Sequence, residues 1–168
     1  MIAYEWDEFK DHIWLAVDCC QNVAVFTCSV AKGLPYWIQV PDSEMQNVDE
    51  ELSTLPSFAQ IEGITDQVLY IESHGSESCN FPRSWALKGL FYYDYTFTRD
   101  TQCFYECNAA PVPPLHVDLL PPRLQMLAKH FVVKKCFAPL SYEDMIEFER
   151  RQRRPFDPIR NILPDDFA

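Results

Sequence analysis

The chain has 168 residues, of which 48% are hydrophobic and 14% aromatic, so it can bury a substantial core and is not a disordered protein. Its formal net charge of −11 disfavours a nucleic-acid-binding surface. No apolar run approaches the roughly 18 residues of a membrane-spanning helix, and residues 1–10 lack the layout of a signal peptide, so we expect one cytoplasmic domain over residues 1–168.

The first predicted elements are two strands, at residues 13–18 and 23–27, separated by a short segment that can turn. Both runs are almost continuously apolar, which is typical of strands that are central in a sheet or buried on both faces. The short connection predicts that the two strands form a hairpin.

A helix is predicted next, starting at a capping box formed by Ser43 and Gln46 and ending before Pro56. Its apolar stripe consists of Met45, Val48, Leu52 and Leu55. The opposite side is acidic and should face water, and it carries Asp49, Glu50 and Glu51.

The middle of the chain combines a short helix with a second hairpin. Residues 67–71 fit a strand, although a helix is an alternative over so short a run. Residues 82–88 predict a helix that stops at Gly89. The aromatic and β-branched run 90–98 predicts a strand that turns back into a second strand at residues 103–108.

The last third begins with residues 110–122, which contain five prolines and predict no long regular element. Pro121 and Pro122 suit the first turn of a helix, whose apolar stripe is Leu124, Leu127, Ala128 and Phe131. Residues 132–137 are a candidate strand, and Ser141 starts a last helix that ends at Pro155.

The C-terminal tail, residues 155–168, is interrupted by prolines but has three apolar side chains available to pack back on the domain: Ile159, Ile162 and Phe167. No internal repeat or low-complexity linker divides the chain. These elements together predict a single α+β domain, with a mostly antiparallel sheet flanked by helices.

The seven cysteines show no pattern that is typical of a metal site. No CxxC pair occurs, and Cys103 and Cys107 would lie about 13 Å apart in a strand at ~3.3 Å per residue. Cys19 and Cys20 would point to opposite faces if their backbone is extended. The spacing therefore predicts no metal and no cofactor, and a reducing compartment would keep the cysteines as mostly structural thiols.

Catalytic motifs are also missing from the sequence. There is no glycine-rich phosphate loop, HExxH or GxSxG, and adjacent acids on a helix diverge around its axis. A cysteine nucleophile needs a histidine nearby in space, and four are scattered along the chain without a motif, at His12, His74, His116 and His130. The prediction is that the protein is not an enzyme.

One basic cluster interrupts the acidic chain at residues 150–154, which include four arginines. It is a weak indication of nucleic-acid binding, because Glu147 and Glu149 belong to the same predicted helix.

The sequence favours recognition of a protein through the surface instead. Tryptophan and tyrosine are typical interface anchors, although filling the core is the alternative for each of Trp6, Trp14, Trp37 and Trp85.

Three stretches carry a resemblance to a known group of proteins. Residues 14–27 read as a strand, a turn and a strand ending in Phe-Thr. Residues 85–94 run from a helix end into a Gly-Leu-aromatic strand, and residues 103–127 place a proline-rich crossover between a strand and a helix. In these features the chain resembles the small immunity proteins encoded beside bacterial polymorphic toxins.

The resemblance implies a cytoplasmic antidote that binds a cognate basic toxin and occludes its active or substrate-binding site. An acidic surface can enter a cationic groove and speed association. The candidate contacts are Tyr36 and Trp37 as anchors, and Asp42, Glu44, Asp49, Glu50 and Glu51 for charge. The alternatives are a structural or adaptor protein of a phage or secretion system and, third, a cysteine-dependent hydrolase.

Overall fold

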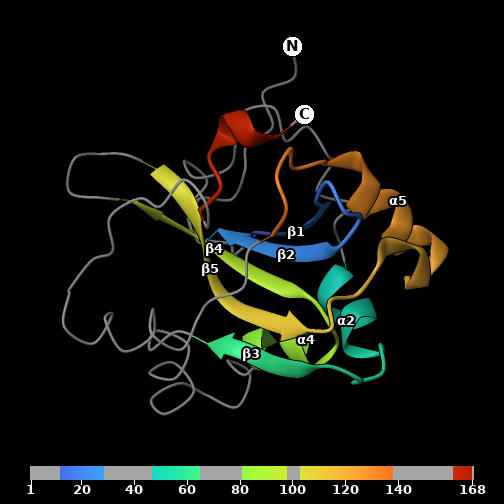
Figure 1. Cartoon of the computed structure of the whole chain (residues 1–168). Helices are drawn as coiled ribbons and strands as arrows, with labels where there is room; N and C mark the ends of the chain where they lie inside the picture. Colours follow the sequence, from blue (N-terminus) through green and yellow to red (C-terminus); the bar gives the residue numbers. More distant parts are fainter. Residues whose placement is uncertain (1–11, 29–46, 65–80, 98–102, 138–160, 168) are drawn as a thin grey trace.

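The described strands form one sheet in the order β1-β2-β4-β5-β3 (Figure 1). The structure is a computed structural model, and it describes residues 12–28, 47–64, 81–97, 103–137 and 161–167. Three pairings in the sheet are antiparallel, and the pairing of β2 with β4 is parallel. The predicted α+β class with a mostly antiparallel sheet is confirmed.

The predicted first hairpin is also confirmed. Strand β1 (His12–Val17) pairs antiparallel with β2 (Val23–Cys28), with Val17 opposite Val23 next to the turn. Alternate side chains of both strands enter two different apolar clusters, one on each face of the sheet. Burial on both faces explains why the two runs are nearly continuous in apolar residues.

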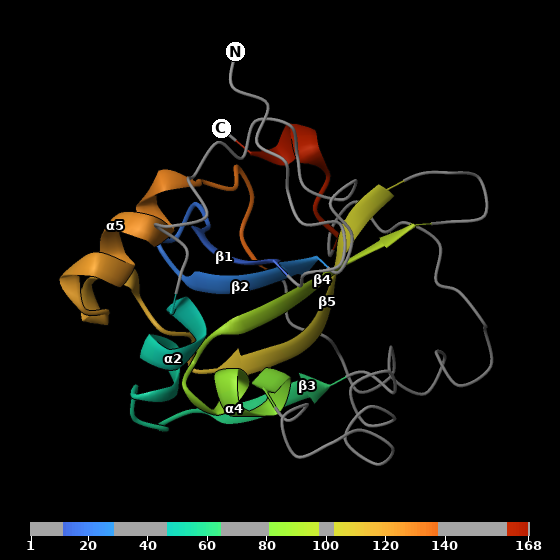
Figure 2. The same cartoon turned by 180° about the vertical axis from the view of Figure 1, so that it is seen from behind.

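The three described α-helices cover one face of the sheet. Helices α2 (Val48–Ser53), α4 (Phe81–Leu87) and α5 (Pro122–His130) share a buried cluster with side chains such as Leu15 and Val25. Figure 2 shows α4 in front of β3 and β5, whereas in Figure 1 it lies behind them.

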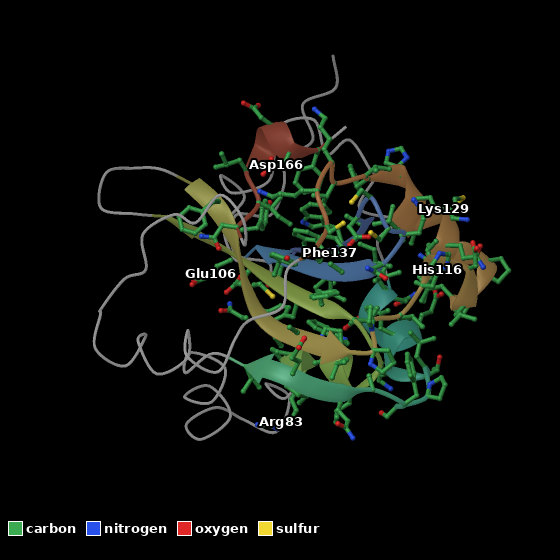
Figure 3. All side chains as sticks on the ribbon, viewed as in Figure 1. Arg83, Glu106, His116, Lys129, Phe137 and Asp166 are labelled. Carbon is green, nitrogen blue, oxygen red and sulfur yellow. The ribbon has the colours of Figure 1, made fainter. Side chains whose placement is uncertain are left out.

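The other face of the sheet is covered by irregular backbone. Residues from 131–137 and 161–167 pack there on an aromatic cluster that includes Trp14, Phe26 and Tyr93. In Figure 3, Phe137 lies over the middle of the sheet on this side. Trp14 and Trp85 are 1% and 3% exposed, so these two tryptophans fill the core and are not surface anchors.

The helix stop predicted at Gly89 is confirmed, since α4 ends two residues earlier and Gly89 has a φ of 84°. A Cβ atom at this position would lie 2.7 Å from Cζ of Phe58 and 2.9 Å from the backbone nitrogen of Leu115. Both the left-handed conformation and the close approach therefore require glycine.

The second hairpin follows as predicted. Strand β4 (Phe91–Phe97) pairs antiparallel with β5 (Cys103–Val112). The prediction ended the second strand at Asn108, which is wrong, because β5 continues through Pro111 to Val112. Pro111 is tolerated because it lies opposite Ile61, where the register with the neighbouring strand shifts.

Two further details differ from the sequence prediction. Strand β3 (Gln60–Ile64), which pairs with the unexpected end of β5, was not predicted. Residues 132–137 do not form a strand. They make only isolated bridges, between Val132 and Val17 and between Val133 and Phe167.

Helix α2 begins later than predicted. Asn47 precedes it with a left-handed φ of 65° and makes no side-chain cap, so α2 starts at Val48 and ends at Ser53. The predicted capping box at Ser43 and Gln46 lies outside the described residues, as do the predicted elements at 67–71 and from Ser141 onward.

Helix α5 begins at Pro122, as predicted, after the short 3-10 helix η3 (Val117–Leu119). The C-terminal segment packs back as expected. Ile162 and Phe167 are buried on either side of the 3-10 helix η4 (Pro164–Asp166), whereas Ile159 lies outside the described residues. Among the described helices, none combines the length and apolarity that a bilayer crossing requires.

Candidate functional site

Three cysteines from distant parts of the chain meet at the surface next to the end of β1. Cys19 and Cys20 lie in the β1–β2 turn, and Cys136 lies in the segment after α5. The Sγ atoms of Cys20 and Cys136 are 3.0 Å apart, and those of Cys19 and Cys20 are 3.9 Å apart. All three sulfur atoms lie within 4.8 Å of one another. We call these three residues the thiol cluster.

The carboxylate of Asp18 holds both sides of the thiol cluster in place. It is fully buried, and its Oδ1 accepts hydrogen bonds from the backbone N–H groups of Cys20 at 2.9 Å and Asn22 at 2.8 Å. Its Oδ2 accepts a bond at 2.9 Å from the backbone N–H of Phe137, the residue after Cys136. One side chain thereby fixes the turn and the distant segment relative to each other.

Besides Asp18, backbone hydrogen bonds and an ion pair hold the segment that carries Cys136. Val17 donates its N–H to the carbonyl of Phe131 at 3.0 Å, and Val133 donates to the carbonyl of Val17 at 2.8 Å. Lys135 forms an ion pair with Asp166 at 2.7 Å. The position of Cys136 is therefore set by β1 on one side and by the C-terminal segment on the other.

The Cys136 thiol has a strongly shifted acidity. Hydrogen bonding with Cys19, and next with Cys20, raises the pKa of the Cys136 thiol from an ordinary value of 9.0 to about 12. Because the proton stays on this sulfur near neutral pH, Cys136 is a weak nucleophile in the thiol cluster. This disfavours Cys136 as the nucleophile of a cysteine-dependent hydrolase.

The raised pKa of Cys136 predicts slow alkylation. At pH 8 and in EDTA, the C19A/C20A double variant should alkylate Cys136 about 30-fold faster than the unmodified protein, since a lower pKa raises the thiolate fraction and only partly lowers nucleophilicity. Iodoacetamide labelling followed by peptide mass spectrometry measures the rate. Equal rates in the two proteins would contradict the assigned hydrogen bonds.

The thiol cluster is not visible in the sequence, for a physical reason. Cys19 and Cys20 would diverge in extended backbone, but the two residues occupy a turn and their sulfur atoms lie on the same side. Cys136 is 116 residues from Cys20 in sequence, so no spacing rule could pair them. The available signal was a Cys-Cys pair in a hairpin turn directly after an aspartate.

A second feature of chemical interest is the acidic side of α2. Glu50 is exposed, Asp49 and Glu51 are half-buried, and Glu51 forms an ion pair with Arg123 of α5. Val48 and Leu52 of the same helix are buried in the core. Glu50 therefore lies opposite the apolar stripe and faces water as expected, whereas Asp49 and Glu51 flank the stripe and are only partly exposed.

The end of α2 is anchored by a buried lysine. Lys88, which is 6% exposed, donates from Nζ to the carbonyl oxygens of Ser53, at 3.2 Å, and Leu55. A cation at the C-terminus of a helix satisfies carbonyl groups that have no partner within the helix. The acidic side of α2 is therefore held on a fixed element.

The other predicted contact residues, Tyr36, Trp37, Asp42 and Glu44, lie outside the described residues.

Among the histidines, the Nδ1 atom of His116 accepts a hydrogen bond from the backbone N–H of Asp118 at 3.3 Å. Asp118 also pairs with Lys129 at 3.1 Å, and Figure 3 shows His116 and Lys129 on the same side of the molecule. His116 thus has a structural role at the start of η3.

Comparisons of the chain with protein-family models, with curated proteins and with solved structures find no match.

Proposed function

We propose that this protein acts by contact and not by turnover: it binds and neutralises a basic protein in the cytoplasm, as an immunity protein neutralises its toxin. The partner's cationic substrate groove would receive the acidic side of α2. The charge of −11 supports this proposal, because a strong negative field draws a basic partner into rapid encounter.

The observation that carries the proposal is the fixed position of the acids on α2. Glu50 is exposed and Asp49 is half-buried on a helix whose Val48 and Leu52 are 1% and 0% exposed. A preorganised charged surface loses less conformational entropy on binding than flexible side chains on a loop do. Glu51 is already paired with Arg123, so we assign the main electrostatic contacts to Asp49 and Glu50.

The neutralising function is tested first in cells. Co-expression of this protein with a toxin encoded by a neighbouring gene should restore growth, and the two proteins should co-purify in an association that weakens as salt is added. A purified protein that binds no neighbouring gene product and gives no rescue would overturn the proposed function.

The binding surface is tested by charge reversal. The D49K/E50K variant should associate with the partner about tenfold more slowly at low salt, because the steering charge is inverted. The matched control is E62K/D165K, which changes the net charge equally at two exposed positions outside α2 and should slow association less than about twofold. Surface plasmon resonance at several salt concentrations gives both rates.

Helix stability must be separated from binding in this experiment. Acids in the first turn of α2 also complement the helix dipole, so each variant is first compared by thermal unfolding. If D49K/E50K is folded and binds at an unchanged rate, the partner contacts another surface. If the same variant still rescues cell growth, the neutralising function stands and α2 is excluded as the binding surface.

A further inference from the structure

The thiol cluster has the geometry of a metal-binding site that the ligand spacing in the sequence does not reveal. A tetrahedral zinc ion with Zn–S bonds near 2.3 Å holds its sulfur ligands about 3.8 Å apart. The Cys19 and Cys20 sulfurs are 3.9 Å apart, which already matches this value. The Cys20 and Cys136 sulfurs, at 3.0 Å, need to separate by about 0.8 Å around the metal.

We propose that Cys19, Cys20 and Cys136 together bind one zinc ion through three thiolates, with the fourth coordination position open to solvent. Binding releases the thiol protons to solvent as the Zn–S bonds form, and no change in oxidation state is involved. All three cysteines are exposed, so an ion can enter and a water molecule can complete the tetrahedron.

The surrounding structure prepares these ligands before the metal arrives. Asp18 bonds to the backbone of Cys20 and of Phe137, so it positions both arms of the site. Cys19 and Cys20 lie in the turn that follows β1, and Cys136 lies in a segment that makes β-bridges to Val17 and to Phe167. A site assembled by the fold binds metal without ordering the chain first.

The ligand set also indicates which ions are suitable. Three thiolates are soft ligands that select zinc and other thiophilic ions over Mg²⁺ and Ca²⁺, which require oxygen ligands. A bound ion would connect residues 116 positions apart in the sequence and so stabilise the folded state. This inference is independent of the proposed toxin-binding function.

The first test uses the full-length, reduced protein with Zn²⁺ and Co²⁺ as probes. Zinc should bind at one ion per chain and raise the melting temperature by about 5–10 °C when it is present at a hundredfold excess over Kd. Cobalt should give tetrahedral visible bands and a thiolate-to-metal charge-transfer band in the near ultraviolet. Mg²⁺ should change neither readout.

The second test removes each ligand. The variants C19A, C20A and C136A should each weaken zinc binding at least about tenfold and lower the cobalt charge-transfer intensity by about one third. The matched control is C107A, which removes a buried thiol outside the cluster and should leave zinc affinity within about twofold. Circular dichroism without metal checks that every variant is folded.

Two results would overturn the proposal. One is an absence of zinc binding and of cobalt spectra in the reduced, folded protein. The other is zinc affinity that C107A lowers as much as C20A does. In the first case, a Cys20–Cys136 disulfide that forms on oxidation would identify the cluster as a redox pair.

Discussion

Replacing Trp14 with alanine should lower the free energy of unfolding by about 4 kcal/mol, the largest stability effect that we expect from a single substitution in this protein. Trp14 stacks on Phe26 with ring centroids 4.4 Å apart and meets Tyr105, Phe131 and Phe167 edge-on or tilted, at 5.2–5.5 Å. It therefore joins two strands, the end of α5 and the C-terminal segment.

The expected loss of unfolding free energy in W14A has two causes: the indole is no longer buried, and a cavity remains in its place. Rigid aromatic neighbours cannot collapse into the space, so relaxation recovers little of the loss. Urea unfolding monitored by far-ultraviolet circular dichroism measures the effect without relying on the removed fluorophore. A loss below about 1.5 kcal/mol would contradict a close-packed aromatic face.

The control for Trp14 is M126A on the outer side of α5. Met126 is 60% exposed, so its truncation should change the free energy of unfolding by less than about 0.5 kcal/mol. Comparable losses in W14A and M126A would mean that burial does not determine what the truncation of a side chain costs in this protein.

Replacing Asp18 with alanine should lower the free energy of unfolding by about 3 kcal/mol. The substitution removes a carboxylate that accepts hydrogen bonds from Cys20, Asn22 and Phe137, and the N–H of Phe137 is buried. A buried donor without a partner costs more than the mean value of one hydrogen bond. The measurement is again urea unfolding, here followed by tryptophan fluorescence.

A matched acid tests whether charge or position causes the effect of D18A. Asp165 is exposed, and D165A should change stability by less than about 0.5 kcal/mol. The isosteric D18N should fall between the two, because an amide oxygen still accepts hydrogen bonds but without charge. Equal stability of D18A and the unmodified protein would show that Asp18 does not fix the segment after α5.

The local elements with a strong signal in sequence were predictable. The apolar runs of β1 and β2, the aromatic run of β4 and the glycine stop at Gly89 depend on neighbours within a few residues. Strand β3 was missed because its weakly patterned residues gain their pairing from β5, which lies about fifty residues further along the chain. The continuation of β5 through Pro111 depends on the same partner.

The candidate sites also include features that the sequence predicts and features that only the fold creates. The acids of α2 and the outward position of Glu50 follow from helical periodicity alone, but the pairing of Glu51 with Arg123 of α5 does not. The thiol cluster could not be predicted from spacing, because the β1–β2 turn and the segment after α5 meet only in the folded chain.

The sequence by itself determined the α+β class, the acidic surface and most of the individual strands and helices, because these follow from composition and short-range periodicity. Only the tertiary structure decided the strand order, the cover of one sheet face by irregular segments, and the meeting of Cys19, Cys20 and Cys136. Those features depend on contacts between residues distant in the chain, which burial and the hydrogen bonds of Asp18 select.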